Sequence, residues 1–517
     1  MTKMLPPQDV CNKLIRVYFL ESEGLYRTTR LSVFEKEYNE FWDGESNTHD
    51  SFLPRLLCML CLAAQFGKGW RGRDRDGNAT IHIPTAYALV GEWLDERTRT
   101  DTFDISTLQT KLLHFFARKL ISAKKSLVWV EVGYLARMGM QLGLHRDPMI
   151  QGASISAGEK ESRRRLWFTL MELDVQTSIH LNLPCTFSWA SVACASPGNF
   201  DEKEIEVDTL DVPFSRPLEE VTENHLQAYA SGTLRVRTQA VELLARVGAW
   251  NYEEVLTITR QLEKTLTNIA KLFPTALGKP LSAPSSGHPE WRRRVYLDLH
   301  VRVPLMAIYR RYGLRNPDCP PDIRRGFLNS SMAVLAFLEV DRGGGGGASS
   351  DGGDPSATRV MLSMLRGVMV SAVLIVCHFI KSARGPDWED GDGGAPEIFG
   401  WDVDCLLRTV DTALEKMLGF VEMTGSASVG ELIALSIVRE VVQAGSISEK
   451  VGEVQLRFDR IMGACLKVAA SMAPVSCFSD FRLLFSPPFF PFLSSLFTFV
   501  LFLSTFLSSV FCFGDSS

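Results

Sequence analysis

The sequence lacks the clustered side chains that zinc sites and common enzyme active sites require. Its eleven cysteines are scattered along 517 residues, and the Cys58-x-x-Cys61 pair has no second pair at ligand spacing. Their Leu-Leu-Cys-Met-Leu-Cys-Leu setting predicts core thiols. A His-Glu-x-x-His motif, a Gly-x-Ser-x-Gly elbow and a Walker loop are also absent from the sequence. We therefore predict no catalytic or metal-binding residue in this chain and do not expect an enzyme.

An excess of positive charge is lacking too. The chain has 55 Lys and Arg residues against 60 Asp and Glu, a formal net charge of −5 at pH 7. Surfaces that bind nucleic acid are usually basic because they neutralise phosphates. The composition therefore argues against a chain whose main surface binds phosphates. No secretory signal opens the chain and its cysteines are not paired, which together predict a reducing compartment.

Alternating apolar and polar residues, typical of strands, are scarce, whereas apolar residues recur at helical spacing along most of the chain. We predict an all-α fold: a large irregular multi-helix array with flexible Gly-rich loops and a hydrophobic C-terminal tail. After a helical stripe that follows Pro6-Pro7, the predicted helices are 53–66, 85–94, 108–120, 127–142, 156–183, 221–247, 252–273, 291–312, 357–380, 403–423, 430–444 and 450–472.

The most informative stretch is 127–187. Its first helix runs to about Leu142, where Gly143 supplies a stop of the kind many helices use. Ser156 and Glu159 then have the spacing of a capping box, which predicts the start of a second helix. We expect two packed amphipathic helices joined by a polar connection.

The sequence of this stretch closely resembles the fungal-specific transcription factor domain, the middle homology region of the fungal binuclear zinc cluster regulators. In that family an Ala-Arg-rich helix ends in Leu-Gly-Leu-His-Arg-Asp-Pro, and Glu-x-x-Arg-Arg-Arg-Leu-Trp-Trp, Leu-Asp, Ser and Gly-Arg-Pro follow. The matching positions are Ala136, Arg137, Leu142 to Pro148, Glu161, Arg163 to Trp167, Leu173, Asp174, Ser178 and Pro184. The sequence departs at Phe168, where a second Trp is usual, and at Asn182 and Leu183, where Gly-Arg would stand.

The resemblance spans about residues 10–440 and implies a nuclear regulator of RNA polymerase II transcription. In the family an N-terminal six-cysteine module binds zinc and reads DNA, and the middle region is thought to modulate activity, in some members by sensing a small molecule. A helical binding or scaffold protein, tail-anchored to a membrane, stays open as the alternative. An enzyme comes third, because a catalytic constellation is missing.

Eight residues of the stretch are predicted to form a structural motif: Arg137, His145, Arg146, Asp147, Arg164, Arg165, Trp167 and Asp174. Arg146 and Asp147 are expected to satisfy backbone groups left open where the first helix stops and the second approaches. A carboxylate on an apolar helix face is costly unless it is paired. We therefore expect a buried Asp174 that accepts hydrogen bonds from one of the four arginines of the motif, and its removal to cost about 3 kcal/mol.

A binding pocket is a further prediction for the second helix, because large helical arrays commonly leave cavities between helices. Trp167, Phe168 and Met171 are the candidate wall residues of a mostly apolar effector pocket. Plain core packing of these three side chains is the alternative interpretation.

Composition divides the chain into four segments. We assign a regulatory domain to 1–340 with its core motif at 127–187, a Gly-rich linker to 341–358, a C-terminal helical part of the same array to 359–475, and a hydrophobic tail to 476–517. The glycine run at 343–347 superficially suggests a phosphate loop, but no strand precedes it and its surroundings are low in complexity.

The hydrophobic tail has three interpretations. It has no charged residue from Leu483 to Phe513, and its last part is long enough to span a bilayer, which takes about 20 residues. It also consists almost entirely of Phe, Leu, Ser and Pro, residues that a translated pyrimidine-rich intron would encode. A gene-model error, a membrane anchor and a tail that packs on the core stay open.

We do not expect the chain as given to bind DNA specifically. The family's DNA-reading module needs six closely spaced cysteines that hold two zinc ions, and only Cys11 precedes Cys58. We therefore expect no cofactor here. Either upstream exons are missing, or the protein acts through partners, as a homodimer or as a heterodimer with a related transcription factor. A small-molecule effector is a further expected partner, and a membrane only if the tail is genuine.

Overall fold

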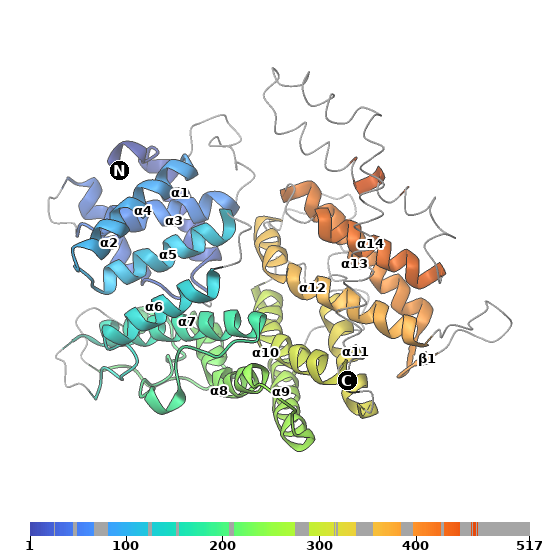
Figure 1. Ribbon diagram of the computed structural model, residues 1–517. Helices are drawn as coiled ribbons and strands as arrows, with labels where there is room; N and C mark the ends of the chain where they lie inside the picture. The colour runs from blue at the N-terminus through green and yellow to red at the C-terminus, as the bar shows by residue number, and fades with distance from the viewer. Residues whose placement is uncertain are drawn as a thin grey trace. The chain divides into compact units, whose positions relative to one another are not determined.

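A computed structural model describes residues 1–24, 26–44, 49–66, 81–121, 127–150, 155–205, 211–273, 289–314, 316, 319–337, 355–383, 397–424, 429–444 and a few positions between 456 and 463. This part is almost entirely helical, which confirms the predicted all-α class (Figure 1). Contacts divide the chain into two compact units, Met1–Leu305 with Gly347–Met361, and Met306–Gly346 with Leu362–Ser517. We call them unit 1 and unit 2.

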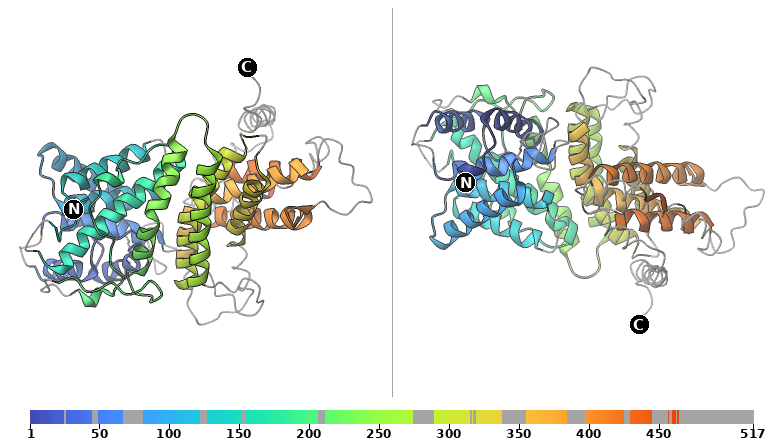
Figure 2. Two further views of the ribbon diagram at one scale, coloured as in Figure 1. Left: turned by 90° about the horizontal axis from the view of Figure 1, so that it is seen from below. Right: turned by 90° about the horizontal axis from the view of Figure 1, so that it is seen from above.

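Unit 1 is a stack of crossing helices, drawn from blue to green in both views of Figure 2. Its elements are η1 (Thr2–Met4), α1 (Gln8–Glu21), α2 (Leu31–Trp42), α3 (Phe52–Phe66), α4 (Ile83–Arg99), α5 (Ile105–Ile121), α6 (Val128–Gln141), α7 (Ala157–Leu181), the short turns η2 (Trp189–Ser191) and η3 (Glu202–Glu204), α8 (His225–Ala245), α9 (Tyr252–Leu272) and most of α10 (Pro289–Gly313). The boundary with unit 2 falls one residue after Pro304, which interrupts the hydrogen bonding of α10 because proline has no N–H.

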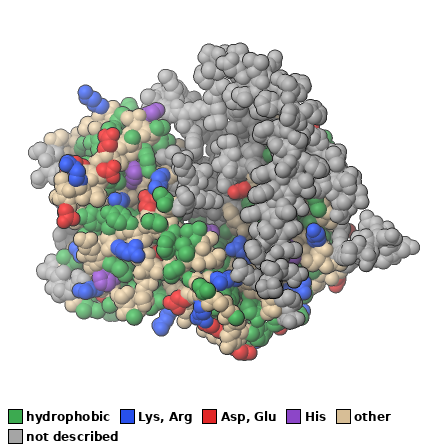
Figure 3. All heavy atoms as spheres, viewed as in Figure 1, with side chains coloured by type: hydrophobic (Ala, Val, Ile, Leu, Met, Phe, Trp, Pro, Cys, Tyr) green, Lys and Arg blue, Asp and Glu red, His purple; other side chains and the backbone are tan. Residues whose placement is uncertain are grey.

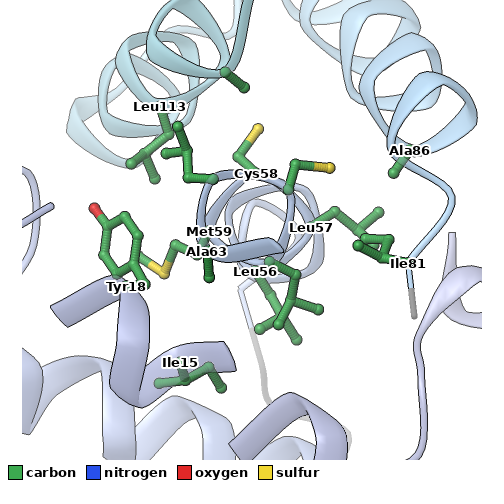
Figure 4. Packing of buried hydrophobic residues seen from close by; sticks show 14 of the residues in the cluster. Ile15, Tyr18, Leu56, Leu57, Cys58, Met59, Ala63, Ile81, Ala86 and Leu113 are labelled. Carbon is green, nitrogen blue, oxygen red and sulfur yellow. The ribbon is translucent and has the colours of Figure 1, made fainter. Parts of the chain in front are cut away.

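Helix α3 is the centre of the N-terminal helices and packs against α1, α4 and α5. It is apolar nearly all round, as expected for a helix that is covered on every side. Cys58 and Cys61 are both buried in it, and Figure 4 shows Cys58 among apolar side chains. Burial raises the pKa of Cys61 to about 12, which disfavours the thiolate that zinc requires. The two cysteines are core thiols, as predicted.

Unit 2 holds the end of α10 and the helices α11 (Pro321–Ala336), α12 (Pro355–Ala383, from Leu362 onward), α13 (Val403–Thr424) and α14 (Val429–Ala444), with strands β1 (Glu397–Ile398) and β2 (Trp401–Asp402). The two strands pair antiparallel. Between them Phe399 and Gly400 both have positive φ, 54° and 87°, as a two-residue hairpin turn requires. Asp411 of α13 and Arg439 of α14 join their helices through two hydrogen bonds of 2.8 and 2.6 Å.

Most of the predicted helices are present, although α4 is longer than predicted and α2 and α11 were not predicted. Helix α12 begins at Pro355, so the last four residues of the predicted 341–358 linker are helical. The rest of that linker, most of the predicted helix 450–472 and the tail 476–517 lie outside the described residues. Within the described residues, no helix is both long enough and apolar enough to cross a membrane.

Candidate functional site

The stretch 127–187 folds as the packed pair α6 and α7 (Figure 1). The two helices approach closely where α6 carries Gly139, because a Cβ there would lie only 2.6 Å from Cδ1 of Leu170. Trp167, which is fully buried, lies beside the same glycine. A larger residue at position 139 would require the Leu170 side chain to shift.

Both helix ends follow the predicted signals. Gly143 has φ of 76°, and the N–H of Leu144 donates to the carbonyl of Gly139, so α6 ends in a left-handed glycine. At the start of α7 the Ser156 hydroxyl accepts a hydrogen bond of 3.2 Å from the N–H of Glu159, which confirms the predicted cap.

Asp147, in the connection between α6 and α7, is almost fully buried and has four hydrogen bonds. The Arg164 guanidinium donates two of 2.9 Å, and the N–H groups of Met149 and Ala195 donate one each, also of 2.9 Å. Burial alone would raise the pKa of Asp147, but the bonds from Arg164 and the two amides lower it below its usual value. The neighbouring Arg146 is exposed, and its backbone forms an isolated β-bridge with Ala193.

The connection from α7 to α8, residues 183–224, runs back over this helix pair, and we call it the strap. Three buried carboxylates each accept a backbone N–H from the strap: Asp174 from Thr186, Asp147 from Ala195 and Glu161 from Gly198. The carboxylates of the family motif therefore hold a long connection against the two helices. Residues 206–210 of the strap lie outside the described residues.

Asp174 is fully buried, as predicted, but the prediction that it bonds an arginine is wrong. The N–H and the hydroxyl of Thr186 donate to its two oxygens at 2.6 and 3.1 Å. Among the described residues no arginine forms an ion pair with Asp174, and Arg137 acts only through its nearby charge. The strap occupies the position beside this carboxylate. Arg164 pairs with Asp147 instead, and Arg165 pairs with Glu161. Burial raises the pKa of Asp174 to about 6, against the opposing effects of the strap amides and Arg137.

Arg165 lies in a second cluster of buried charges. It bonds Glu161 at 3.0 Å within α7 and also reaches Glu202, which stands at the start of η3 in the strap. Arg27 and Arg30, which come between α1 and α2, approach the same Glu202 carboxylate at 3.4 and 3.6 Å. One strap carboxylate thus joins α7 to the N-terminal helices.

About two turns after Arg165, α7 carries Glu172, whose partners are on α8 and α10. The guanidinium of Arg237 donates two hydrogen bonds of 2.6 Å to its carboxylate, and His300 lies 3.5 Å away. Burial raises the pKa of Glu172, but Arg237 and His300 outweigh that effect and hold it at about 2. This is a fully buried, doubly bonded ion pair.

The three predicted pocket residues lie in close packing. Trp167 and Met171 are completely buried, and the Trp167 ring contacts Phe187 and His145 at centroid distances of 6.4 and 6.1 Å. Phe168 lines a small space between α7 and α8, together with Gln227, Leu234 and others, that has no room for a water-sized molecule. The effector pocket at these residues stays a prediction.

Sequence reasoning missed the residues whose partners are distant in the chain. Glu172 and Arg237 are 65 positions apart, and Glu202 and Arg27 are 175 positions apart. The available signal was a charged residue at each of positions 172 and 174 within the mostly apolar stretch 166–175 of α7, which indicates that both faces are buried there. Among the described residues no group of three or more His, Cys, Asp or Glu side chains is placed to hold a metal ion, so these residues do not fit a zinc cluster.

Comparison with known proteins gives the family of this arrangement. Residues 15–222 match the fungal specific transcription factor domain, a segment that begins in α1 and ends in the strap. The chain is 29% identical to transcription factor opdR of Penicillium oxalicum, over 65% of this chain and 42% of the relative. It is 25% identical to the Zn(2)-C6 fungal-type transcription factor mpsB of Macrophomina phaseolina, over 60% of this chain and 41% of the relative.

A third relative is the equisetin cluster transcription factor eqxF of Fusarium heterosporum, 27% identical over 41% of this chain and 32% of the relative. The chain thus spans less than half of the length of each of these relatives. The domain match at 15–222 includes the α6 and α7 pair. The chain therefore contains a fungal specific transcription factor domain, and its relatives are fungal transcription factors.

Proposed function

We propose that this protein regulates transcription in the nucleus and that the described chain supplies the regulatory part rather than the DNA-reading part. The observation that carries the proposal is the domain match at 15–222, which includes the motif helices and most of the strap. The buried joints between them give this region one defined arrangement. We also propose that the protein is not an enzyme, which agrees with relatives that are transcription factors.

A reporter assay tests the regulatory role. The chain is fused to an unrelated DNA-binding module in fungal cells, and output from a promoter with that module's site is compared with the module alone. We expect a severalfold change in output, because a regulatory domain acts wherever it is tethered. Equal output from both proteins at equal abundance would contradict the proposal.

Two neighbouring arginines provide matched variants for this assay. Arg164→Ala removes the partner of buried Asp147, whereas Arg163→Ala breaks only a partly exposed pair with Glu159 on the surface of α7. We expect the first variant to lose the reporter effect and the second to keep it. Immunoblots separate loss of regulation from loss of protein.

The nuclear location is tested by a fluorescent fusion at the N-terminus of the full chain. We expect nuclear fluorescence. Fluorescence on membranes would contradict the proposal and favour the membrane-anchored scaffold.

We further propose that this chain does not bind DNA specifically by itself and acts with partners, as a homodimer or as a heterodimer with a related factor. On the face shown in Figure 3 the described Lys and Arg side chains of unit 1 are interspersed with Asp and Glu, which favours neither strong nor specific phosphate binding. Fluorescence anisotropy of the purified chain with selected DNA pools at about 0.15 M salt is the test. Sequence-specific, zinc-dependent binding would refute the proposal. Analytical sedimentation of the purified chain tests whether a homodimer forms. Copurification with a coexpressed relative tests whether a heterodimer forms.

A further inference from the structure

The first strap segment, Leu183–Ser188, is attached to the helix pair at one buried carboxylate. Asp174 accepts both the N–H and the hydroxyl of Thr186, and the N–H of Phe187 also bonds it. Two further contacts lie at the end of α7, where the Pro184 carbonyl accepts the Trp129 indole N–H at 3.3 Å and the Ser178 hydroxyl at 3.2 Å. Asp174 is therefore covered by the segment that it holds.

This joint differs from the next one along the strap in the charge of its donors. Asp147 is bonded by the Arg164 guanidinium as well as by Ala195, so its negative charge is compensated. Among the described residues the printed donors to Asp174 are all neutral, and Arg137, an exposed residue of α6, acts on it through its charge without a hydrogen bond. Burying an ionised carboxylate without a bonded cation is costly, and taking up a proton relieves that cost.

We propose that the joint between Asp174 and Thr186 is a proton-operated latch that holds segment Leu183–Ser188 more tightly on acidification and lets it open more easily at neutral pH. The direction follows from linkage: opening exposes the carboxylate to water, where it ionises readily, whereas closing buries it and favours the protonated form. A proton therefore binds the closed latch more tightly than the open one.

The charged and titratable groups that act on the latch come from the segment itself, from α6 and from α8. Cys185 in the segment has a pKa raised far above neutral by burial and by Asp174 itself, so it stays a thiol. Arg137 on α6 acts on Asp174 through its charge. From α8, Arg237 and Glu242 act on Cys185, and Arg237 is bonded to Glu172, whose carboxylate stays ionised.

Hydrogen exchange of the full chain, followed by mass spectrometry from pH 5 to pH 7, measures the latch at the amides of Thr186 and Phe187 after correction for intrinsic rates. With a pKa of about 6 in the closed form and about 3.9 in water, we expect the opening equilibrium to fall about tenfold between pH 7 and pH 5. Asp174→Asn keeps an acceptor and a donor for Thr186 but has no charge. It should exchange slowly at both pH values, with the pH dependence abolished.

Asp147→Asn is the matched control, because it also neutralises a buried strap carboxylate, but one whose pKa lies below this range. It should leave the pH response at Thr186 intact. If Asp174→Asn does not fold, Thr186→Val gives a second reading: losing a hydrogen bond to the charged form should move the midpoint of the response to higher pH. Exchange at Thr186 and Phe187 that is independent of pH in the wild type, or that weakens on acidification, would overturn the proposal.

Discussion

Two carboxylates on α7 lie two positions apart and are equally buried, yet they differ in what surrounds their charge. Glu172 is bonded by the guanidinium of Arg237, and its pKa is held at about 2. Asp174, which points to nearly the opposite side of the helix, is bonded by Thr186, and burial raises its pKa to about 6. Burial alone therefore does not determine whether a carboxyl group is charged. The hydrogen-bond partner decides whether its pKa is raised or lowered.

The two carboxylates also have opposite effects on stability as the pH changes. Glu172 has a lowered pKa in the folded protein, so its stabilising effect is present above about pH 4 and is lost as the pH falls toward 2. Asp174 has a raised pKa, so the folded protein gains stability as the pH falls through 6 toward 4. One helix thus carries two buried carboxylates with opposite pH dependence: Glu172 stabilises the fold at neutral pH, whereas Asp174 stabilises it more in mild acid.

The strongest way to break this contrast is to remove the cation from Glu172. Arg237→Met leaves the buried Glu172 carboxylate without its guanidinium, although His300 and Gln176 stay beside it, and we expect the free energy of unfolding at pH 7 to fall by about 3–5 kcal/mol. Urea denaturation followed by circular dichroism measures it. In this variant the pKa of Glu172 should rise, so that mild acid restores part of the lost stability.

The control is the double variant Glu172→Met with Arg237→Met, which removes both charges. Replacing a whole buried ion pair by apolar residues of similar size is often neutral, so most of the loss should be recovered. A double variant as unstable as Arg237→Met alone would show that the arginine stabilises the protein through Thr233 and Ala230, which it also bonds.

A smaller effect is expected at Asp147, which stands between the two extremes because it has both an arginine and strap amides. Arg164→Ala should lower the free energy of unfolding by about 2 kcal/mol, less than at Arg237 because the Arg164 side chain is 12% exposed. It should also increase hydrogen exchange at Ala195. Arg163→Ala, at a partly exposed pair on the same helix, should change the free energy of unfolding by less than about 0.5 kcal/mol.

Local signals in the sequence predicted the helices of this region better than their charge pairs. The stop at Gly143, the cap at Ser156 and the burial of Asp174 all follow from residues within a few positions of each other. Helix α2 was missed although Leu31, Phe34, Tyr38 and Phe41 recur at helical spacing, so its sequence did contain a usable signal.

The partner of Asp174 could not be predicted because the motif offers four candidate arginines and the actual donor, Thr186, lies in a loop. A loop without periodicity gives no signal about where it folds back. The same limit applies to Glu202, whose three arginines come from two distant segments. The sequence pattern indicates which charges are buried, whereas the topology of the strap decides how they pair.

The smallest of the three expected changes in the free energy of unfolding is at Asp174 itself, and it tests the comparison of the two carboxylates directly. If a buried carboxylate without a bonded cation costs stability, then Asp174→Asn should not destabilise the protein at pH 7 and should raise its free energy of unfolding by about 1–2 kcal/mol. The gain should vanish near pH 4, where the wild-type carboxyl is protonated in the folded and partly in the unfolded state. Urea titrations of both proteins at pH 4 and pH 7 measure the difference. A loss of about 3 kcal/mol at pH 7 would instead mean that Asp174 is paired with a cation after all, since that is the cost of leaving a buried charge without its partner.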